Sequence, residues 1–137
     1  MEPALVDALA ARCTVLGFTV ARDDGAHLSL HREFLRARWP FGRRRITYDA
    51  TVTLDDRERT VRLRERTIEV SSGVFLTAEH ETSTQIGRTV RRRRAGRSIG
   101  IDGSSVAFDL DLGAVSRAVQ SITEAHGWHF SSVVVAT

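Results

Sequence analysis

The sequence contains no lysine and no asparagine, and all twenty of its cationic residues are arginines. Without lysine, the chain lacks the phosphate-loop lysine of nucleotide triphosphatases and the amine that forms Schiff bases with pyridoxal cofactors. Those two classes of enzyme are therefore excluded. Because arginine supplies every positive charge of the chain, a high arginine count alone does not indicate binding.

Cysteine and long apolar runs are also scarce. The one cysteine, Cys13, cannot form an internal disulfide, and its spacing from Leu5, Leu9 and Leu16 indicates a buried structural thiol on a helix. No apolar run approaches the ~20 residues that a membrane-spanning helix needs, and the first residues resemble neither a signal peptide nor a transit peptide. We expect a cytoplasmic protein that does not contact a membrane.

Sequence motifs of catalytic and metal sites are missing as well. His27 and His31 have the HxxxH spacing of a zinc helix, but Leu28 stands where the HExxH motif has glutamate. The histidines join no cysteine or carboxylate cluster. No G-x-S-x-G nucleophile elbow is present. We therefore expect no metal, no cofactor and no enzymatic activity.

Two segments have the apolar spacing of amphipathic helices. In residues 3–16, Leu5, Leu9 and Cys13 recur every four residues between Pro3 and the capping residue Gly17. The second helix is expected over residues 112–126, where Asp111 can cap the start and Gly127 the end, with a buried stripe of Val115, Ala118, Val119, Ile122 and Ala125.

Most of the remaining chain alternates apolar and polar residues as strands do, most regularly over residues 46–54. We expect a hairpin over residues 18–32, a return strand over 61–70 with one extra residue near Glu65-Arg66, a strand over 74–78, a hairpin over 99–110 and a buried strand over 128–135. A short helix over residues 27–39 is the alternative, because Leu30 and Phe34 lie four apart.

These elements predict an α+β fold in one domain spanning residues 1–137. We expect a single sheet of about six to seven strands, mostly antiparallel, with both helices on one face. The order along the chain is helix, five to six strands, helix, strand. A polar stretch starting near Thr82 shows no core face, so we expect a mobile basic loop or hairpin tip at about residues 82–98.

The charge of the chain is concentrated in two segments. Residues 32–45 hold six arginines and one glutamate, a net charge of +5, and residues 88–97 hold six arginines and no acid, a net charge of +6. The rest of the chain carries −8, although the whole chain carries +3. Such uneven charge focuses an electric field on the two segments and is typical of proteins that bind anions.

The candidate anion-binding residues are therefore the arginines of the two segments, with one aromatic ring beside them: Arg36, Arg38, Trp39, Arg43, Arg44, Arg45, Arg88, Arg91, Arg92, Arg93, Arg94 and Arg97. Two alternatives stay open. The second segment can be a solvated loop whose arginines pair with acids of the same chain or of another copy. Trp39 and Phe41, on either side of Pro40, can fold back over the sheet instead of stacking on bases.

The sequence thus predicts a non-catalytic binding module whose arginines contact an anionic partner, with the phosphates of RNA or DNA as the main candidates. The alternative is a homo-oligomeric interaction domain in which basic segments meet acidic surface. An enzyme or small-ligand carrier is a third hypothesis, but no motif supports it.

Overall fold

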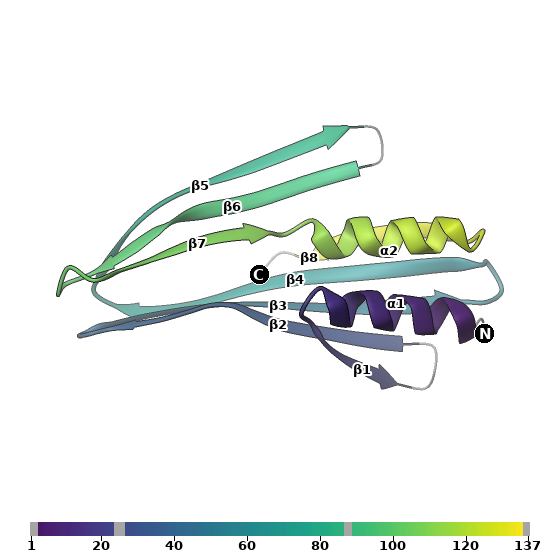
Figure 1. The fold of residues 1–137 in the computed structure, drawn as a ribbon, viewed down its shortest axis with the longest axis horizontal. Helices are drawn as coiled ribbons and strands as arrows, with labels where there is room; N and C mark the ends of the chain where they lie inside the picture. Colours follow the sequence, from purple (N-terminus) through teal and green to yellow (C-terminus); the bar gives the residue numbers. More distant parts are fainter. Residues whose placement is uncertain (1–2, 24–26, 87–88, 136–137) are drawn as a thin grey trace. The chain divides into compact units, whose positions relative to one another are not determined.

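The computed structural model describes residues 3–23, 27–86 and 89–135, and within residues 81–92 it describes no side chains. Two helices and eight strands follow one another within these ranges (Figure 1). Their order is α1 (Pro3–Val15), β1 (Thr19–Asp23), β2 (His27–Trp39), β3 (Gly42–Asp55), β4 (Thr60–Gly73), β5 (Phe75–Ile86), β6 (Thr89–Gly100), β7 (Ser105–Asp111), α2 (Ala114–Ala125) and β8 (His129–Val135).

The α+β class and both helices are confirmed, but the expected single sheet of six to seven strands is wrong. The described strands form a five-stranded sheet in the order β1-β2-β3-β4-β8 and a three-stranded sheet in the order β5-β6-β7. Periodicity shows which face of a strand is buried but not which strands share hydrogen bonds. The change of sheet comes after Gly73, whose φ of 85° is a conformation that favours glycine.

Residues 27–39 form a strand, so the alternative helix is wrong. Along β2 the buried positions change phase: Leu28 and Leu30 are buried, and then Leu35, Ala37 and Trp39 are buried. A strand that keeps one phase buries every second residue. Leu30 and Phe34, whose spacing suggested the helix, are four residues apart in this strand, a spacing that strand and helix patterns share.

The last strand forms where it was expected, but it is not buried. β8 pairs with β4 in parallel, in unbroken register from Thr60 opposite His129 to Arg66 opposite Val135. It stands at the end of the strand order, and Val133 and Val134 are 59% and 52% exposed. The extra residue expected near Glu65-Arg66 does not interrupt this pairing.

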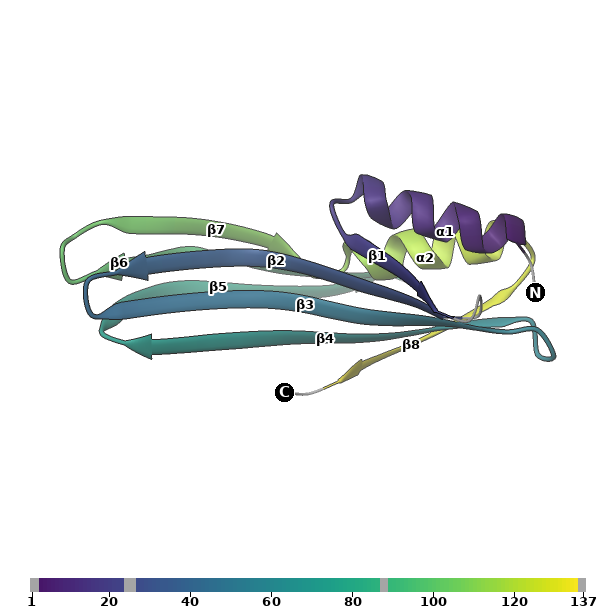
Figure 2. The same cartoon turned by 90° about the horizontal axis from the view of Figure 1, so that it is seen from below.

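The chain forms two compact units, and neither is continuous in sequence. The first consists of Met1–Arg32, Tyr48–Thr67 and Ala114–Thr137. Its two helices contact each other and cover one face of the strands of this unit (Figure 2). Its largest fully buried side chains are Leu5, Leu9, Leu28, Leu30, Tyr48, Val52, Val61, Leu63, Val115, Val119 and Thr123.

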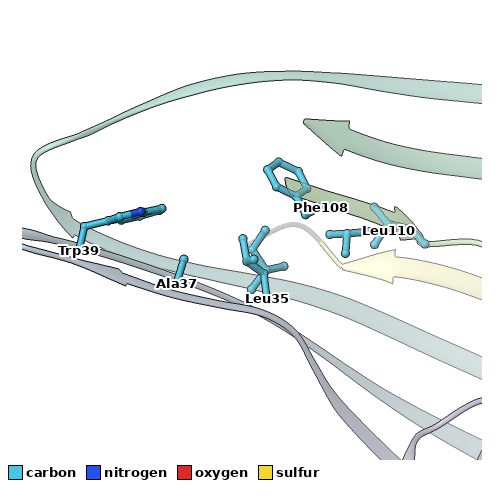
Figure 3. Packing of buried hydrophobic residues seen from close by; sticks show 7 residues of the cluster. Leu35, Ala37, Trp39, Phe108 and Leu110 are labelled. Atoms are coloured by element: carbon cyan, nitrogen blue, oxygen red, sulfur yellow. The ribbon is translucent and has the colours of Figure 1, made fainter. Parts of the chain in front are cut away.

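The second unit consists of Glu33–Thr47 and Ile68–Gly113. Side chains from β2 and β3 pack against side chains from β7 and the residue after it, in a cluster of Leu35, Ala37, Trp39, Ile46, Phe108, Leu110 and Leu112. Figure 3 shows Leu35, Ala37 and Trp39 pointing toward Phe108 and Leu110. This unit contains both arginine-rich segments apart from Arg32, so the candidate site belongs to it.

Candidate functional site

The first arginine-rich segment forms two neighbouring strands with exposed arginines. Successive side chains of β2 and β3 point to opposite faces of the sheet, and Ala37, Trp39 and Ile46 point into the core of the second unit. The arginines next to these positions, on the opposite phase of the two strands, point away from that core and are exposed. We call these residues, Arg36, Arg38, Arg43 and Arg45, the arginine face.

The arginine face borders a cavity of about 420 Å³. All four of its arginines line this cavity, together with Ala37, Arg44 and, from β4, Val70. None of the described residues that line the cavity is acidic. Arg36 Nε makes an ion pair with Glu33 at 3.0 Å, and Arg43 Nε donates to Ser72 Oγ at 3.0 Å. The cavity is thus bordered by several exposed cations.

The two aromatic rings beside the arginine face have opposite environments. Trp39 is 5% exposed and stacks on Phe75, with ring centroids 5.1 Å apart. Phe41 is 80% exposed and lies in the turn between β2 and β3. Trp39 is therefore a buried residue, and Phe41 is the exposed ring of this segment.

Arg44, expected to bind an external anion, is instead buried in the second unit. Its side chain is 3% exposed, and Nη2 donates to Glu69 Oε1 at 2.6 Å and to Glu79 Oε2 at 2.9 Å. Nη1 donates to Ser98 Oγ at 3.0 Å, and the guanidinium carbon lies 4.9 Å from the centre of the Phe108 ring. The positive charge of Arg44 is already neutralised by carboxylates of its own unit.

Arg94 completes this cluster from β6. It donates from Nη2 to Glu69 Oε1 and to Glu79 Oε1, both at 2.8 Å. We call Arg44, Glu69, Glu79 and Arg94 the ion-pair cluster; it contains two cations and two carboxylates. Burial alone would raise the pKa of Glu79, but the hydrogen bonds from Arg94 and Arg44 outweigh burial and lower it. A balanced cluster of this kind offers no unpaired charge to a ligand.

The second arginine-rich segment is partly neutralised too. Arg93 donates through Nε and Nη2 to the two carboxylate oxygens of Asp109, at 2.7 and 2.6 Å. This hydrogen bonding lowers the pKa of Asp109 and raises the pKa of Arg93. Arg97 is exposed on β6. Arg88 and the side chains of Arg91 and Arg92 lie outside the described residues.

The segment expected as a loop or hairpin tip pairs as strands. β5 and β6 are antiparallel from Phe75 opposite Gly100 to Ile86 opposite Thr89. Residues 87 and 88, at the turn between the strands, lie outside the described residues. Two consecutive arginines of β6 have carboxylate partners: Arg94 meets the glutamates of the ion-pair cluster, and Arg93 meets Asp109.

The histidines and the cysteine have structural surroundings. His27 Nδ1 lies 3.1 Å from Thr53 Oγ1, and His31 Nδ1 lies 2.6 Å from Asp49 Oδ1, so each has its own partner on β3. Burial raises the pKa of Cys13 to about 11, which keeps the thiol protonated and unreactive at neutral pH. The described residues include no group of three or more histidine, cysteine and acidic side chains able to hold a metal ion.

The ion-pair cluster was missed by sequence analysis, although one signal pointed to it. The alternation that buries Ile46, Tyr48, Ala50, Val52 and Leu54 extends back to Arg44, which predicts an inward side chain. Its partners Glu69 and Glu79 come from β4 and β5, and no periodicity of the sequence pairs them with Arg44.

No protein-family model, curated protein or solved structure matches this chain. No helix in the described ranges is long and apolar enough to span a membrane.

Proposed function

We propose that this chain is a cytoplasmic, non-catalytic binding module that holds the phosphate backbone of a nucleic acid, RNA or DNA, on the arginine face. One observation carries the proposal. Four exposed arginines on two neighbouring strands line one cavity of about 420 Å³, and the described lining contains no acid.

The uneven neutralisation of the arginines supports a binding role for these four. Like charges on neighbouring strands repel and destabilise the sheet. For three other arginines of the second unit this repulsion is offset: Arg44 and Arg94 share two glutamates, and Arg93 has Asp109. In the arginine face only Arg36 has a described carboxylate partner, Glu33, and both are partly exposed. An anion in the cavity would remove the remaining repulsion.

The chemistry of the guanidinium group favours phosphate as that anion. Each guanidinium presents donors in a planar fork that fits two phosphate oxygens. Four arginines spread over two strands can contact several phosphates at once, and a nucleic-acid backbone offers such a row of phosphates. Binding several of them releases condensed counterions, which adds affinity at low salt.

The test compares two double variants of equal charge. Arg38→Gln/Arg43→Gln removes two arginines of the arginine face, and Arg12→Gln/Arg57→Gln removes two exposed arginines elsewhere. Affinity for a labelled single-stranded oligonucleotide is measured by fluorescence anisotropy at several salt concentrations. We expect wild-type affinity to fall steeply with salt, and the first variant to lose about tenfold or more in affinity with a salt slope smaller by about 1–2. The control variant should bind like wild type apart from a small general loss.

Two outcomes would overturn the proposal: wild-type protein that does not bind the oligonucleotide, or equal losses in the two double variants. A salt-sensitive dimer without affinity for nucleic acid, detected by sedimentation, would support the alternative in which the arginine face of one copy meets acidic surface of another.

A further inference from the structure

Phe41 is a large apolar side chain that the fold leaves in solvent. It is 80% exposed, and it occupies the turn between β2 and β3 with a φ of 62°. Positive φ is unusual for a residue with a bulky side chain. Pro40 precedes it, and a turn with proline in the first central position and positive φ in the second ordinarily has glycine or asparagine there. The backbone conformation of the turn therefore does not explain why position 41 is a phenylalanine.

The backbone of this turn is held by the neighbouring turn between β4 and β5. Val74 N donates to the Phe41 carbonyl oxygen at 2.6 Å. A side chain on Gly73 would collide with the same carbonyl group, so the two turns lie in close contact. This support keeps the backbone of Phe41 in its unusual conformation while the ring stays exposed.

The exposed ring stands beside the arginine face. A second cavity, of about 230 Å³, is lined by Arg38, Trp39, Phe41, Gly42, Arg43, Ser72 and Gly73. Arg38 and Arg43 also line the larger cavity. One cavity is thus lined by an exposed phenylalanine and two exposed arginines, with no acid among its described lining residues.

We propose that Phe41 stacks on an unpaired base of the bound nucleic acid while Arg38 and Arg43 hold the phosphates beside that base. This inference rests on the proposed function and adds to it that the ligand is single-stranded. In a duplex each base already stacks on its neighbours, whereas a base of a single strand has a free face for an aromatic side chain. An aromatic platform next to arginines is the usual arrangement in proteins that bind single strands.

The variant Phe41→Gly separates the binding role of the ring from a structural one. Glycine adopts positive φ freely, so the variant should unfold at the same denaturant concentration as wild type or at a higher one. Affinity for a single-stranded oligonucleotide should fall about 5- to 150-fold. Affinity for the duplex of the same sequence should not change. The variant Phe41→Trp keeps an aromatic ring and should retain single-strand binding.

Three results would overturn the stacking role. The first is that Phe41→Gly leaves single-strand affinity unchanged, and the second is that it weakens duplex and single-strand binding equally. In either case the proposed phosphate contacts of the arginine face still hold if Arg38→Gln/Arg43→Gln binds the oligonucleotide weakly. Vesicles of anionic phospholipid provide the third arm: binding to vesicles that depends on Phe41, without affinity for oligonucleotides, would reject the nucleic-acid ligand and the stacked base together.

Discussion

Arg44 belongs to an arginine-rich segment, yet its side chain is buried inside the second unit. Its neighbours Arg43 and Arg45 are exposed, but its own side chain points inward and reaches Glu69 and Glu79. Two residues that differ by one position in a strand face opposite sides of the sheet. A count of charges along the sequence therefore does not separate exposed arginines from buried arginines that pair with carboxylates.

We expect Arg44→Met to destabilise the fold by about 2–4 kcal/mol, because it leaves two carboxylates with the single partner Arg94. Arg45→Met removes the same charge from the exposed side of β3 and should change the free energy of unfolding by no more than about 0.5 kcal/mol. Chemical denaturation measures both. Equal effects of the two substitutions would contradict the placement of Arg44.

A double variant tests whether the loss comes from unpaired charge. Arg44→Met/Glu79→Leu leaves Arg94 facing Glu69, one cation for one carboxylate. It should be more stable than Arg44→Met alone, since replacing both partners of a buried pair costs less than removing one. A double variant less stable than Arg44→Met would show that packing, and not charge, dominates at this site.

Among the strands and turns, the contact between the β2–β3 turn and the β4–β5 turn decides where the exposed ring lies. Gly73 ends β4 with a φ of 85°, and Val74 N donates to the carbonyl of Phe41. The hydrophobic pattern of either strand pair does not predict this contact, because it joins two turns distant in sequence.

Gly73→Ala should destabilise the fold by about 2 kcal/mol or more. Alanine is strained at positive φ, and its Cβ would collide with the Phe41 carbonyl group. The midpoint of denaturation measures the loss. Gly103→Ala is the matched control: Gly103 also has positive φ, 82°, but a Cβ there would meet no atom within 4 Å. If both substitutions lower the free energy of unfolding equally, the loss comes from the backbone conformation alone and the contact between the turns contributes nothing.

The sequence pattern gave the wrong surroundings for two strands, β8 and β6. In β8, a run of valines suggested a buried strand, yet Val133 and Val134 are largely exposed, because β8 ends the order of the five-stranded sheet. Residues 82–98 were expected to form a mobile basic loop or hairpin tip because their pattern shows no core face, but β5 and β6 pair there, and β5 and β7 provide carboxylates beside Arg94 and Arg93. In both cases a neighbouring strand decided the outcome.

At the scale of the whole molecule, ion pairs make stability depend on pH. Hydrogen bonds from Arg62 lower the pKa of Asp55, and those from Arg93 lower the pKa of Asp109. The pKa of Glu79 is lowered as well, because its bonds to Arg94 and Arg44 outweigh burial. A carboxyl whose pKa is lower in the folded state stabilises the fold above its ordinary pKa, and this stabilisation is lost as the pH falls through the folded value.

We therefore expect the free energy of unfolding to stay nearly level from neutral pH down to about 5 and to fall as the pH drops below the ordinary values of 4.5 for glutamate and 3.8 for aspartate. Urea denaturation at a series of pH values measures this. Glu79→Gln removes one titrating group, so its stability should fall less steeply between pH 5 and pH 3. A stability that rises on acidification would contradict these ion pairs.

The sequence by itself determined the α+β class, both helices, most strands and the presence of two cationic segments, because helix and strand periodicity and charge are properties of neighbouring residues. Only the tertiary structure decided that the strands form two sheets, that Arg44 and Arg94 are neutralised by Glu69 and Glu79, and that Phe41 rather than Trp39 is exposed. These facts depend on partners far away in the chain. Local pattern shows which way a side chain points, and only the folded chain shows what it meets there.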